Sequence, residues 1–223
     1  MDFLSTSRQG KVLVVELKRT AEGNALNRQL QQELVSAWME LDDSDDLMAA
    51  VLTGSPDVFS IGHDREELLT GNGEAASTQA EEGLFPLSFK KPVIAAIEGP
   101  CYGLGFELAL GCDLRFAGEG AMLGMPDPNL YVRYRLASVL LPRMMYSGPA
   151  MQMIYAGRTL SAEEARRYRL VNQVTPKGQA LAAATAAATA LAGLVTSADA
   201  FKKQLVWRLS GIPIPEAQAE LRS

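Results

Sequence analysis

The chain has few of the residue types on which metal and redox sites depend. Its 223 residues include two cysteines, Cys101 and Cys112, and one histidine, His63. Zinc sites draw on several cysteine or histidine ligands, and a catalytic serine triad needs a histidine. We therefore expect no metal site, no disulfide framework and two buried thiols, and any triad would have to use His63.

Basic charge and long apolar runs are also scarce. The chain carries 21 Lys and Arg against 26 Asp and Glu, a formal net charge of −5, and no basic run stands out. Proteins that bind nucleic acid or anionic lipid usually carry a basic patch. No window approaches the roughly 20 apolar residues of a membrane span, and Met1–Ser5 does not resemble the start of a secretion signal. The composition predicts a soluble cytoplasmic protein with no nucleic-acid or membrane partner.

Hydrophobic residues make up 48% of the chain, enough for one well-buried core. We expect residues 1–195 to form that core and residues 196–223 to form a short C-terminal helical segment. No internal repeat is visible.

The most informative pattern lies in residues 99–113. The apolar strand predicted at Val93–Ile97 runs into a glycine turn, Gly103-Leu104-Gly105, and the residues that follow have the composition of a short buried helix. The start of such a helix leaves N–H groups unpaired and favours negative charge. Glu107 follows about one helical turn later, so an anion site and a carboxylate are expected side by side.

Residues 58–68 predict a second turn of the same kind. Gly62 permits an unusual backbone conformation, and Asp64 can cap a short helix that begins at Arg65. The amide of His63 is left in the turn between them. It is a candidate for a second N–H donor.

Two carboxylates are candidates for acid/base chemistry. Glu107 is surrounded in sequence by apolar residues and is costly to bury without a role, although pairing with Arg115 or Arg133 is the structural alternative. Asp127 lies in a loop stiffened by prolines on both sides, where it is either a catalytic group or a turn residue.

The rest of the chain predicts alternating strands and helices. Strands are expected at 11–17, 48–53, 113–116 and 121–123. Asn27 is expected to cap a helix that ends near Leu41, and Ser161 with Glu164 predicts a capping box. Further helices are expected at 136–147, 149–156, 179–195 and 201–209. The acidic run 42–46 is expected to be a solvated connection. The polar segment 71–83 is expected to be a mobile surface loop or a frayed helix, with a substrate lid as the alternative to an inert loop. Met144, Met145, Met151 and Met153 are expected to pack in the core or between subunits.

Five motifs taken together resemble the crotonase (enoyl-CoA hydratase/isomerase) family. They are Asn24–Asn27, Val51–Gly54 with Phe59–Asp64, Gly103–Ala109 with Cys112–Asp113, Pro126–Asp127, and Ala156–Arg158 continuing to Val174. They occur in the family's order over residues 11–176. The resemblance implies an α/β fold, a crotonase-like spiral of ββα units with a helical C-terminal region, assembled as a homotrimer or hexamer.

The resemblance also implies an acyl-CoA thioester as ligand, with no cofactor beyond the coenzyme A that is part of the substrate. It assigns the oxyanion hole to the N–H groups of His63 and Leu104. Glu107 and Asp127 become the acid/base pair that adds water across a 2-enoyl thioester. The substrate contacts that it implies are Ala21, Gly23, Ala25, Ser60, Gly62, Asp64, Gly103 and Pro126.

The chain departs from the family pattern at several positions. Asp127 stands where hydratases commonly carry Glu, Leu104 replaces a glycine, and Ala21 replaces a lysine that lies near the CoA phosphates. Phosphate binding is then left to Lys18, Arg19 or other residues, and the family's usual last helix is expected to be missing. The alternatives are an isomerase, decarboxylase or thioester hydrolase of the same fold that uses one carboxylate, and a non-catalytic acyl-CoA-binding subunit.

Overall fold

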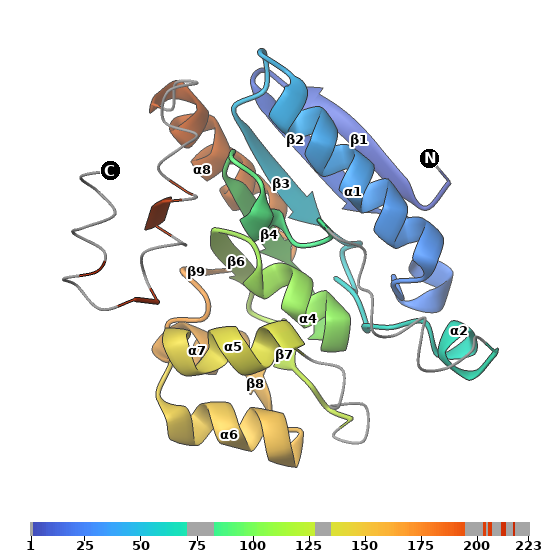
Figure 1. The fold of residues 1–223 in the computed structure, drawn as a ribbon, viewed down its shortest axis with the longest axis vertical. Helices are drawn as coiled ribbons and strands as arrows, with labels where there is room; N and C mark the ends of the chain where they lie inside the picture. The colour runs from blue at the N-terminus through green and yellow to red at the C-terminus, as the bar shows by residue number, and fades with distance from the viewer. Residues whose placement is uncertain are drawn as a thin grey trace.

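The computed structural model describes residues 2–70, 83–127 and 135–194, together with 203, 205, 206, 211, 212 and 216. A six-stranded sheet runs through the centre of the molecule in the order β1-β2-β3-β4-β6-β9 (Figure 1). Its strands are β1 (Leu4–Gln9), β2 (Val12–Leu17), β3 (Ala49–Thr53), β4 (Val93–Ile97), β6 (Leu114–Gly118) and β9 (Gln173–Thr175). Strand β1 is antiparallel to β2, and all other neighbouring pairs in this sheet are parallel.

A second sheet of three strands has the order β5-β7-β8, with β5 parallel to β7 and β7 antiparallel to β8. These strands are β5 (Pro100–Tyr102), β7 (Met122–Gly124) and β8 (Thr159–Ser161). The described helices are α1 (Arg28–Asp43), α2 (Arg65–Thr70), α4 (Gly103–Leu110), α5 (Arg135–Met144), α6 (Ser147–Ala156), α7 (Ala162–Arg167) and α8 (Ala180–Leu194), with short 3₁₀ turns at Thr20–Glu22 and Pro86–Ser88.

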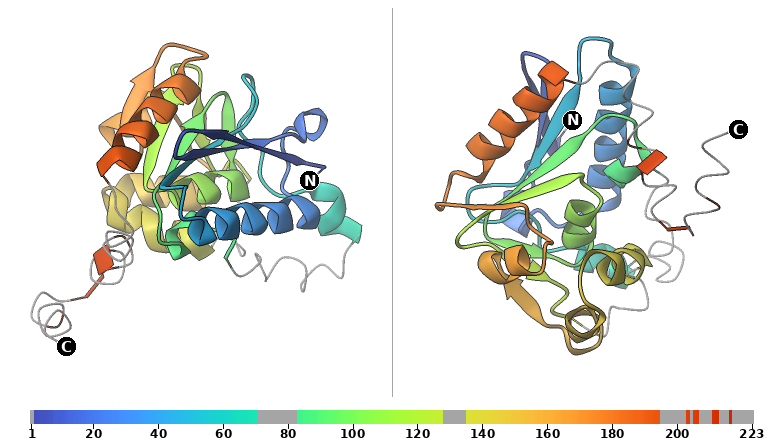
Figure 2. Two further views of the ribbon diagram at one scale, coloured as in Figure 1. Left: turned by 90° about the horizontal axis from the view of Figure 1, so that it is seen from above. Right: turned by 90° about the vertical axis from the view of Figure 1, so that its left-hand side faces the viewer.

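Helices cover both faces of the large sheet. Figure 2 shows α8 on one side and α1 with α4 on the other. Strands β3 and β4 are therefore buried along their whole length, as expected for central parallel strands. Helix α8 places an alanine every fourth residue against the sheet, at Ala180, Ala184, Ala188 and Ala192. These small side chains let the helix pack closely on β2, β3, β4 and β6.

The prediction for α1 is confirmed in detail. The side chain of Asn27 accepts a hydrogen bond from the N–H of Leu30 at 2.9 Å, which is an N-cap interaction. The apolar face predicted for this helix, at Leu30, Leu34, Trp38 and Leu41, is fully buried. The predicted capping box of Ser161 and Glu164 is likewise present at the start of α7. Local sequence is sufficient in both cases because the interacting residues lie within one or two helical turns.

Other local predictions need correction. The acidic run is only partly a solvated connection, because α1 continues through Asp43 and the carboxylate of Asp42 accepts hydrogen bonds from the N–H groups of Lys90 and Lys91. Of the four methionines expected to pack in the core or between subunits, Met145 and Met153 are buried in the core, and for Met151, which is 45% exposed, packing between subunits stays a prediction. Strand β1 was not predicted. It is an edge strand in which only Leu4 is buried, so its sequence shows no apolar alternation.

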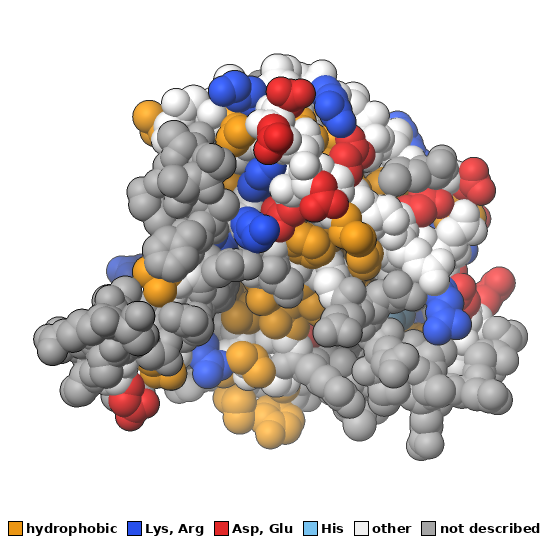
Figure 3. Space-filling model, turned by 45° about the horizontal axis from the view of Figure 1, so that its top comes forward, with side chains coloured by type: hydrophobic (Ala, Val, Ile, Leu, Met, Phe, Trp, Pro, Cys, Tyr) orange, Lys and Arg blue, Asp and Glu red, His pale blue; other side chains and the backbone are white. Residues whose placement is uncertain are grey.

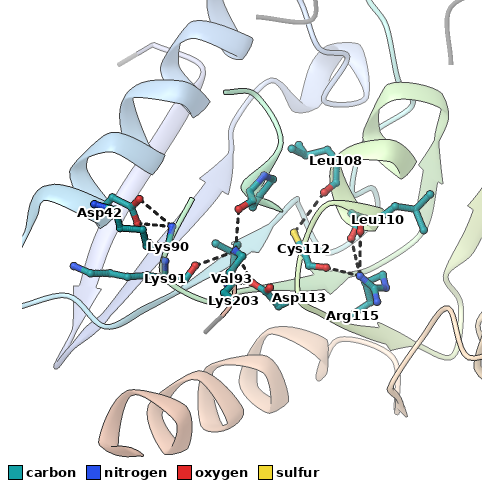
Figure 4. Close-up of polar contacts among 12 residues, drawn as sticks. Asp42, Lys90, Lys91, Val93, Leu108, Leu110, Cys112, Asp113, Arg115 and Lys203 are labelled. Carbon is teal, nitrogen blue, oxygen red and sulfur yellow. Dashed lines mark hydrogen bonds and ion pairs between the residues drawn. The ribbon is translucent and has the colours of Figure 1, made fainter. Parts of the chain in front are cut away.

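Part of the predicted pattern lies outside the described residues, including nearly all of the polar segment 71–83 and most of the helix expected at 201–209. The described Lys203 lies against the core: its Nζ pairs with Asp113 at 2.8 Å and donates to the carbonyls of Pro86 and Lys91 (Figure 4). The division into a core at 1–195 and a segment at 196–223 stays a prediction.

The remaining features concern thiols and surface. Cys101 and Cys112 are free and fully buried, and burial raises the pKa of both thiols. On the face drawn in Figure 3, acidic and basic side chains of the described residues are interspersed. No helix within the described ranges is both long and apolar enough to cross a membrane.

Candidate active site

Two backbone turns that are about forty residues apart in sequence lie against each other. The segment Phe59–Ser60 runs beside β5, with a bridge between Ser60 and Cys101. The N–H of Tyr102 donates to the Ser60 carbonyl at 2.8 Å, and the N–H of Ser60 donates to the Pro100 carbonyl at 3.1 Å. These bonds bring the turn at Gly62 next to the start of α4.

The contact between the turns requires glycine at two positions. Gly62 has φ +103°, and a Cβ placed there would lie 3.0 Å from the Tyr102 carbonyl oxygen and 3.3 Å from the Leu104 nitrogen. A Cβ on Gly105 would lie 2.6 Å from the hydroxyl oxygen of Ser60. The two N–H groups predicted to form an oxyanion hole, those of His63 and Leu104, thus belong to backbone segments in direct contact.

The orientation of these two N–H groups follows from their neighbours. The Leu26 N–H donates to the Gly62 carbonyl, and the Leu26 carbonyl accepts from the Asp64 N–H. Because successive backbone groups of an extended segment point to opposite sides, the N–H of His63 faces away from Leu26. Leu104 is the second residue of α4, so its N–H is among the four that a helix leaves without an internal acceptor.

Glu107 lies one turn further along α4, on the same side as Leu104. Its side chain is buried, with the residue 2% exposed, and its Oε1 accepts a hydrogen bond of 2.8 Å from the N–H of Ala137 in α5. Burial raises the pKa of the carboxyl from 4.5 to about 7, against the opposing effect of the N–H groups of Ala137 and Leu136. At neutral pH, Glu107 is able both to accept and to donate a proton.

Glu107 does not form the ion pair with Arg115 that was the alternative to a catalytic role. The buried guanidinium of Arg115 donates instead to the backbone carbonyls of Leu170, Ala109 and Cys112. Figure 4 shows the contact with Cys112. The other proposed partner, Arg133, lies outside the described residues. The contact that does hold Glu107, with the start of α5, was missed because a backbone donor thirty residues away leaves no sequence pattern.

Asp127 follows β7 in a loop and is tied to the segment after His63. Its Oδ2 pairs with the guanidinium of Arg65 at 3.4 Å, with side-chain exposures of 35% and 77%. Arg65 begins α2, which Asp64 caps through hydrogen bonds from Glu66 and Glu67. His63, Asp64 and Arg65 are consecutive, so the turn, the cap of α2 and the partner of Asp127 belong to one short segment. The role of Arg65 was not predicted.

Ser60 and Asn24 connect the first loop to the His63 turn. The Ser60 hydroxyl donates to the Asn24 carbonyl at 2.8 Å and accepts from the Gly62 N–H at 3.1 Å. The Asn24 side-chain amide donates to the carbonyls of Val58 and Phe59. Both residues are fully buried. Ser60, predicted as a substrate contact, thus orients Gly62 through its hydroxyl.

Arg19 holds the other side of this loop. Its guanidinium donates to the Ala25 carbonyl at 2.9 Å and pairs with Asp64 at 2.5 Å. Burial raises the pKa of the Asp64 carboxyl, but the bond from Arg19 and the helix N–H groups outweigh it and hold the pKa below its ordinary value. Both carboxylate oxygens of Asp64 therefore have partners within the chain: Oδ1 accepts from the N–H groups of Glu66 and Glu67, and Oδ2 pairs with Arg19. Lys18, the other candidate for phosphate binding, pairs with Glu16 at 2.8 Å.

The remaining predicted substrate contacts lie around these turns. Ala21 is exposed in the 3₁₀ turn, Gly23 ends that turn with φ +61°, and Gly103 is the first residue of α4. Pro126 is exposed beside Asp127. None of these contacts is tested by the structure, and they stay predictions. Within the described residues, no group of three or more His, Cys, Asp and Glu side chains could hold a metal ion.

Comparison with known proteins identifies the family. The model of the enoyl-CoA hydratase/isomerase family matches residues 7–222. The chain is 36% identical over 211 residues to a protein named as a probable enoyl-CoA hydratase of Mycobacterium tuberculosis, covering 93% of this chain and 82% of that relative. It is 30% identical over 229 residues to the carnitinyl-CoA dehydratase of Salmonella typhi, covering all of this chain and 87% of the relative.

Solved structures agree with the sequence comparisons. The enoyl-CoA hydratase from Bacillus anthracis matches with a TM-score of 0.90 and 28% identity, over 99% of this chain and 88% of that one. The enoyl-CoA hydratase from Mycobacterium tuberculosis H37Rv matches with a TM-score of 0.87 and 28% identity, over 99% and 87% of the two chains. The predicted α/β fold is confirmed.

Proposed function

Because this chain belongs to the enoyl-CoA hydratase/isomerase (crotonase) family, we propose that it adds water across the double bond of a 2-enoyl-CoA thioester. The observation that carries the proposal is Glu107, a buried carboxyl with a pKa of about 7, one helical turn from the Leu104 N–H. A carboxyl of that pKa can both remove and return a proton at neutral pH.

In the proposed reaction, the thioester carbonyl oxygen accepts hydrogen bonds from the N–H groups of His63 and Leu104. Ionised Glu107 takes a proton from water as the water oxygen bonds to the β-carbon. The electron pair of the double bond moves onto the carbonyl oxygen as an enolate. Two preorganised donors stabilise that charge, and each such donor contributes about 2.7–4 kcal/mol to lowering the barrier.

Asp127 forms the second half of the proposed acid/base pair. In this proposal its carboxylate accepts a hydrogen bond from the same water and orients it. The enolate then collapses as the α-carbon takes a proton from the carboxyl pair, and the two groups return to their starting state. The coenzyme A portion is part of the substrate, and no separate cofactor enters this reaction.

The pairing of Asp127 with Arg65 favours a second candidate within the family. If the ion pair keeps Asp127 from the water, Glu107 alone could move a proton between the α- and γ-carbons of an enoyl-CoA. That reaction is a double-bond isomerisation. It needs the same enolate and the same two N–H donors but no attacking water.

One experiment separates these candidates. The purified protein is mixed with crotonyl-CoA, and loss of the conjugated thioester absorbance is followed while mass spectrometry tests for the gain of one water. Hydration predicts both changes. A 3-enoyl-CoA that becomes conjugated without gaining water would support the isomerase, and ester binding without either reaction would support a non-catalytic acyl-CoA binder.

A further inference from the structure

A pocket of about 220 Å³ lies at the far end of α5 from Glu107. Its walls come from the end of α5, the α5–α6 connection and the end of α7. The lining residues are Arg143, Met144, Met145, Tyr146, Arg167, Tyr168 and Arg169. Three of the seven are arginines and none is acidic, in a protein whose net charge is −5.

The nearby acidic side chains on α7 are engaged by other arginines. Glu163 pairs with Arg166 at 3.5 Å, and Glu164 pairs with Arg158 at 3.0 Å. Neither Arg158 nor Arg166 lines the pocket. Among the described residues, Arg167 and Arg169 have no carboxylate partner, and the guanidinium of Arg143 donates only to the Val139 carbonyl. The positive charge at the pocket is therefore not neutralised by the described part of the chain.

The backbone at Arg169 adds an independent observation. Arg169 has φ +65°, a left-handed conformation at the end of α7 where glycine is the usual residue. A side chain with a Cβ is disfavoured there, and such outliers concentrate at ligand sites. The residue in this disfavoured conformation is also one of the three arginines that line the pocket.

We propose that this pocket, lined by Arg143, Arg167 and Arg169, binds a small phosphate-class anion of about the size of pyrophosphate. Planar guanidinium groups bind phosphate oxygens in pairs, and three of them match an anion that carries several negative charges. The pocket holds the volume of roughly seven water molecules, which suits a small ion. Met144 and Met145 supply its apolar wall.

The pocket is separate from the proposed catalytic groups. Arg143 follows Ala137, the residue whose N–H donates to Glu107, by six positions in α5, a rise of about 9 Å along the helix. The proposal does not depend on the proposed function, because anion binding is measured without turnover. The phosphate can come from a free anion or from the phosphate groups of coenzyme A.

The test is isothermal titration of the full chain with sodium pyrophosphate at low ionic strength. Arg169→Gly removes one guanidinium and relieves the left-handed backbone, so this variant is expected to fold at least as well as the parent. Arg167→Gln removes a second guanidinium from an exposed position. Each change is expected to weaken pyrophosphate binding by about tenfold, the effect of losing a hydrogen bond to a charged group.

Arg166→Gln is the matched control, since this arginine lies beside Arg167 but pairs with Glu163 outside the pocket. It is expected to leave binding unchanged. Undetectable binding to the parent protein, or equal weakening by Arg166→Gln and Arg169→Gly, would overturn the proposal. Repeating the titration with saturating coenzyme A identifies the source: competition assigns the pocket to the coenzyme's phosphates, and independence assigns it to a free anion.

Discussion

The carboxylate of Glu107 in α4 accepts a hydrogen bond of 2.8 Å from the backbone N–H of Ala137, at the start of α5. This bond joins two helices and fixes one oxygen of a buried acid. Burial nevertheless dominates its titration and raises the pKa to about 7. The packing of α5 against α4 therefore sets both the position of Glu107 and its proton affinity.

Replacing Glu107 with Gln is expected to abolish proton transfer while leaving the fold intact. The amide oxygen can still accept the Ala137 N–H, so binding of a CoA ester should change little. Turnover should fall by about 10²–10⁴, the usual contribution of a general acid or base. Steady-state kinetics with crotonyl-CoA measure this loss. Glu119→Gln, at an exposed position, is the control and should keep full activity. Retained activity in Glu107→Gln would remove it from the mechanism.

The pKa of Glu107 predicts how stability depends on pH. Because the folded-state pKa is raised from 4.5 to about 7, the folded protein holds this proton more tightly than the unfolded chain. The resulting stability is fully present below about pH 4.5 and is lost as the pH rises to about 7, by about 3 kcal/mol in total.

Urea unfolding at pH values between 4.5 and 8 measures this dependence. Glu107→Gln should remove it, so the difference in unfolding free energy between the parent and the variant should change across the window. If the unfolding free energies of the parent and the variant instead differ by the same amount at every pH, Glu107 titrates at its ordinary pKa. If ionised Glu107 is the base, turnover should rise as the pH passes through about 7.

Lengthening Asp127 is expected to increase hydration. Asp127→Glu extends the side chain by one methylene, and a misplacement of about 1 Å can cost on the order of 100-fold in rate. We expect a gain of about tenfold in the turnover of crotonyl-CoA. Asp127→Asn, which has the same length but no charge, is the control and should lower the rate. A loss of activity in Asp127→Glu would favour chemistry that uses Glu107 alone.

Adding a methyl group at Gly62 should disturb the oxyanion turn. Gly62 has φ +103°, and the new Cβ would crowd the Tyr102 carbonyl and the Leu104 nitrogen. Gly62→Ala should cost roughly 1–3 kcal/mol of stability. It should also lower turnover by about 10²–10³, as expected when one oxyanion donor is displaced. Thermal unfolding and kinetics measure the two effects.

The chain offers a matched control for this change. Gly10 also has positive φ, at +58°, but a Cβ there meets no atom within 4 Å. Gly10→Ala should therefore destabilise the fold through backbone strain alone and leave kcat unchanged. Similar losses of kcat in both variants would mean that activity reports only on stability.

Lys203 is expected to anchor the segment that follows α8. Its Nζ lies beside Asp113 and two backbone carbonyls, with the side chain 8% exposed. Lys203→Met keeps the length but leaves these acceptors without their cation, which should cost about 3–5 kcal/mol. Thermal unfolding measures this loss, and Lys177→Met, at an exposed position, should have little effect. An unchanged melting temperature in Lys203→Met would exclude the anchor.

Several elements could be predicted from the sequence because their causes are local. The cap of α1 at Asn27 and the capping box at Ser161 join residues three positions apart. The apolar face of α1 is visible in the spacing of its leucines. The turns at Gly62 and Gly103 also carry their own marker, because left-handed backbone favours glycine.

Contacts between distant residues could not be predicted in the same way. No pattern near Asp42 indicates that its carboxylate binds the N–H groups of Lys90 and Lys91. No pattern indicates that Arg19 pairs with Asp64 or that Arg65 pairs with Asp127. Charged side chains of either sign are common on the surface, and their partners depend on how the chain folds back on itself.

By itself, the sequence determined the family, the α/β order of the elements and the candidate groups at His63, Leu104, Glu107 and Asp127, because glycine turns, caps and apolar periodicity are encoded within a few residues. Only the tertiary structure decided what surrounds these groups. Contacts between distant segments bring the Gly62 turn against the Leu104 N–H, bury Glu107 under α5 and attach Asp127 to Arg65. Proton affinity and donor geometry depend on burial and on partners remote in sequence, so they appear only when the chain is folded.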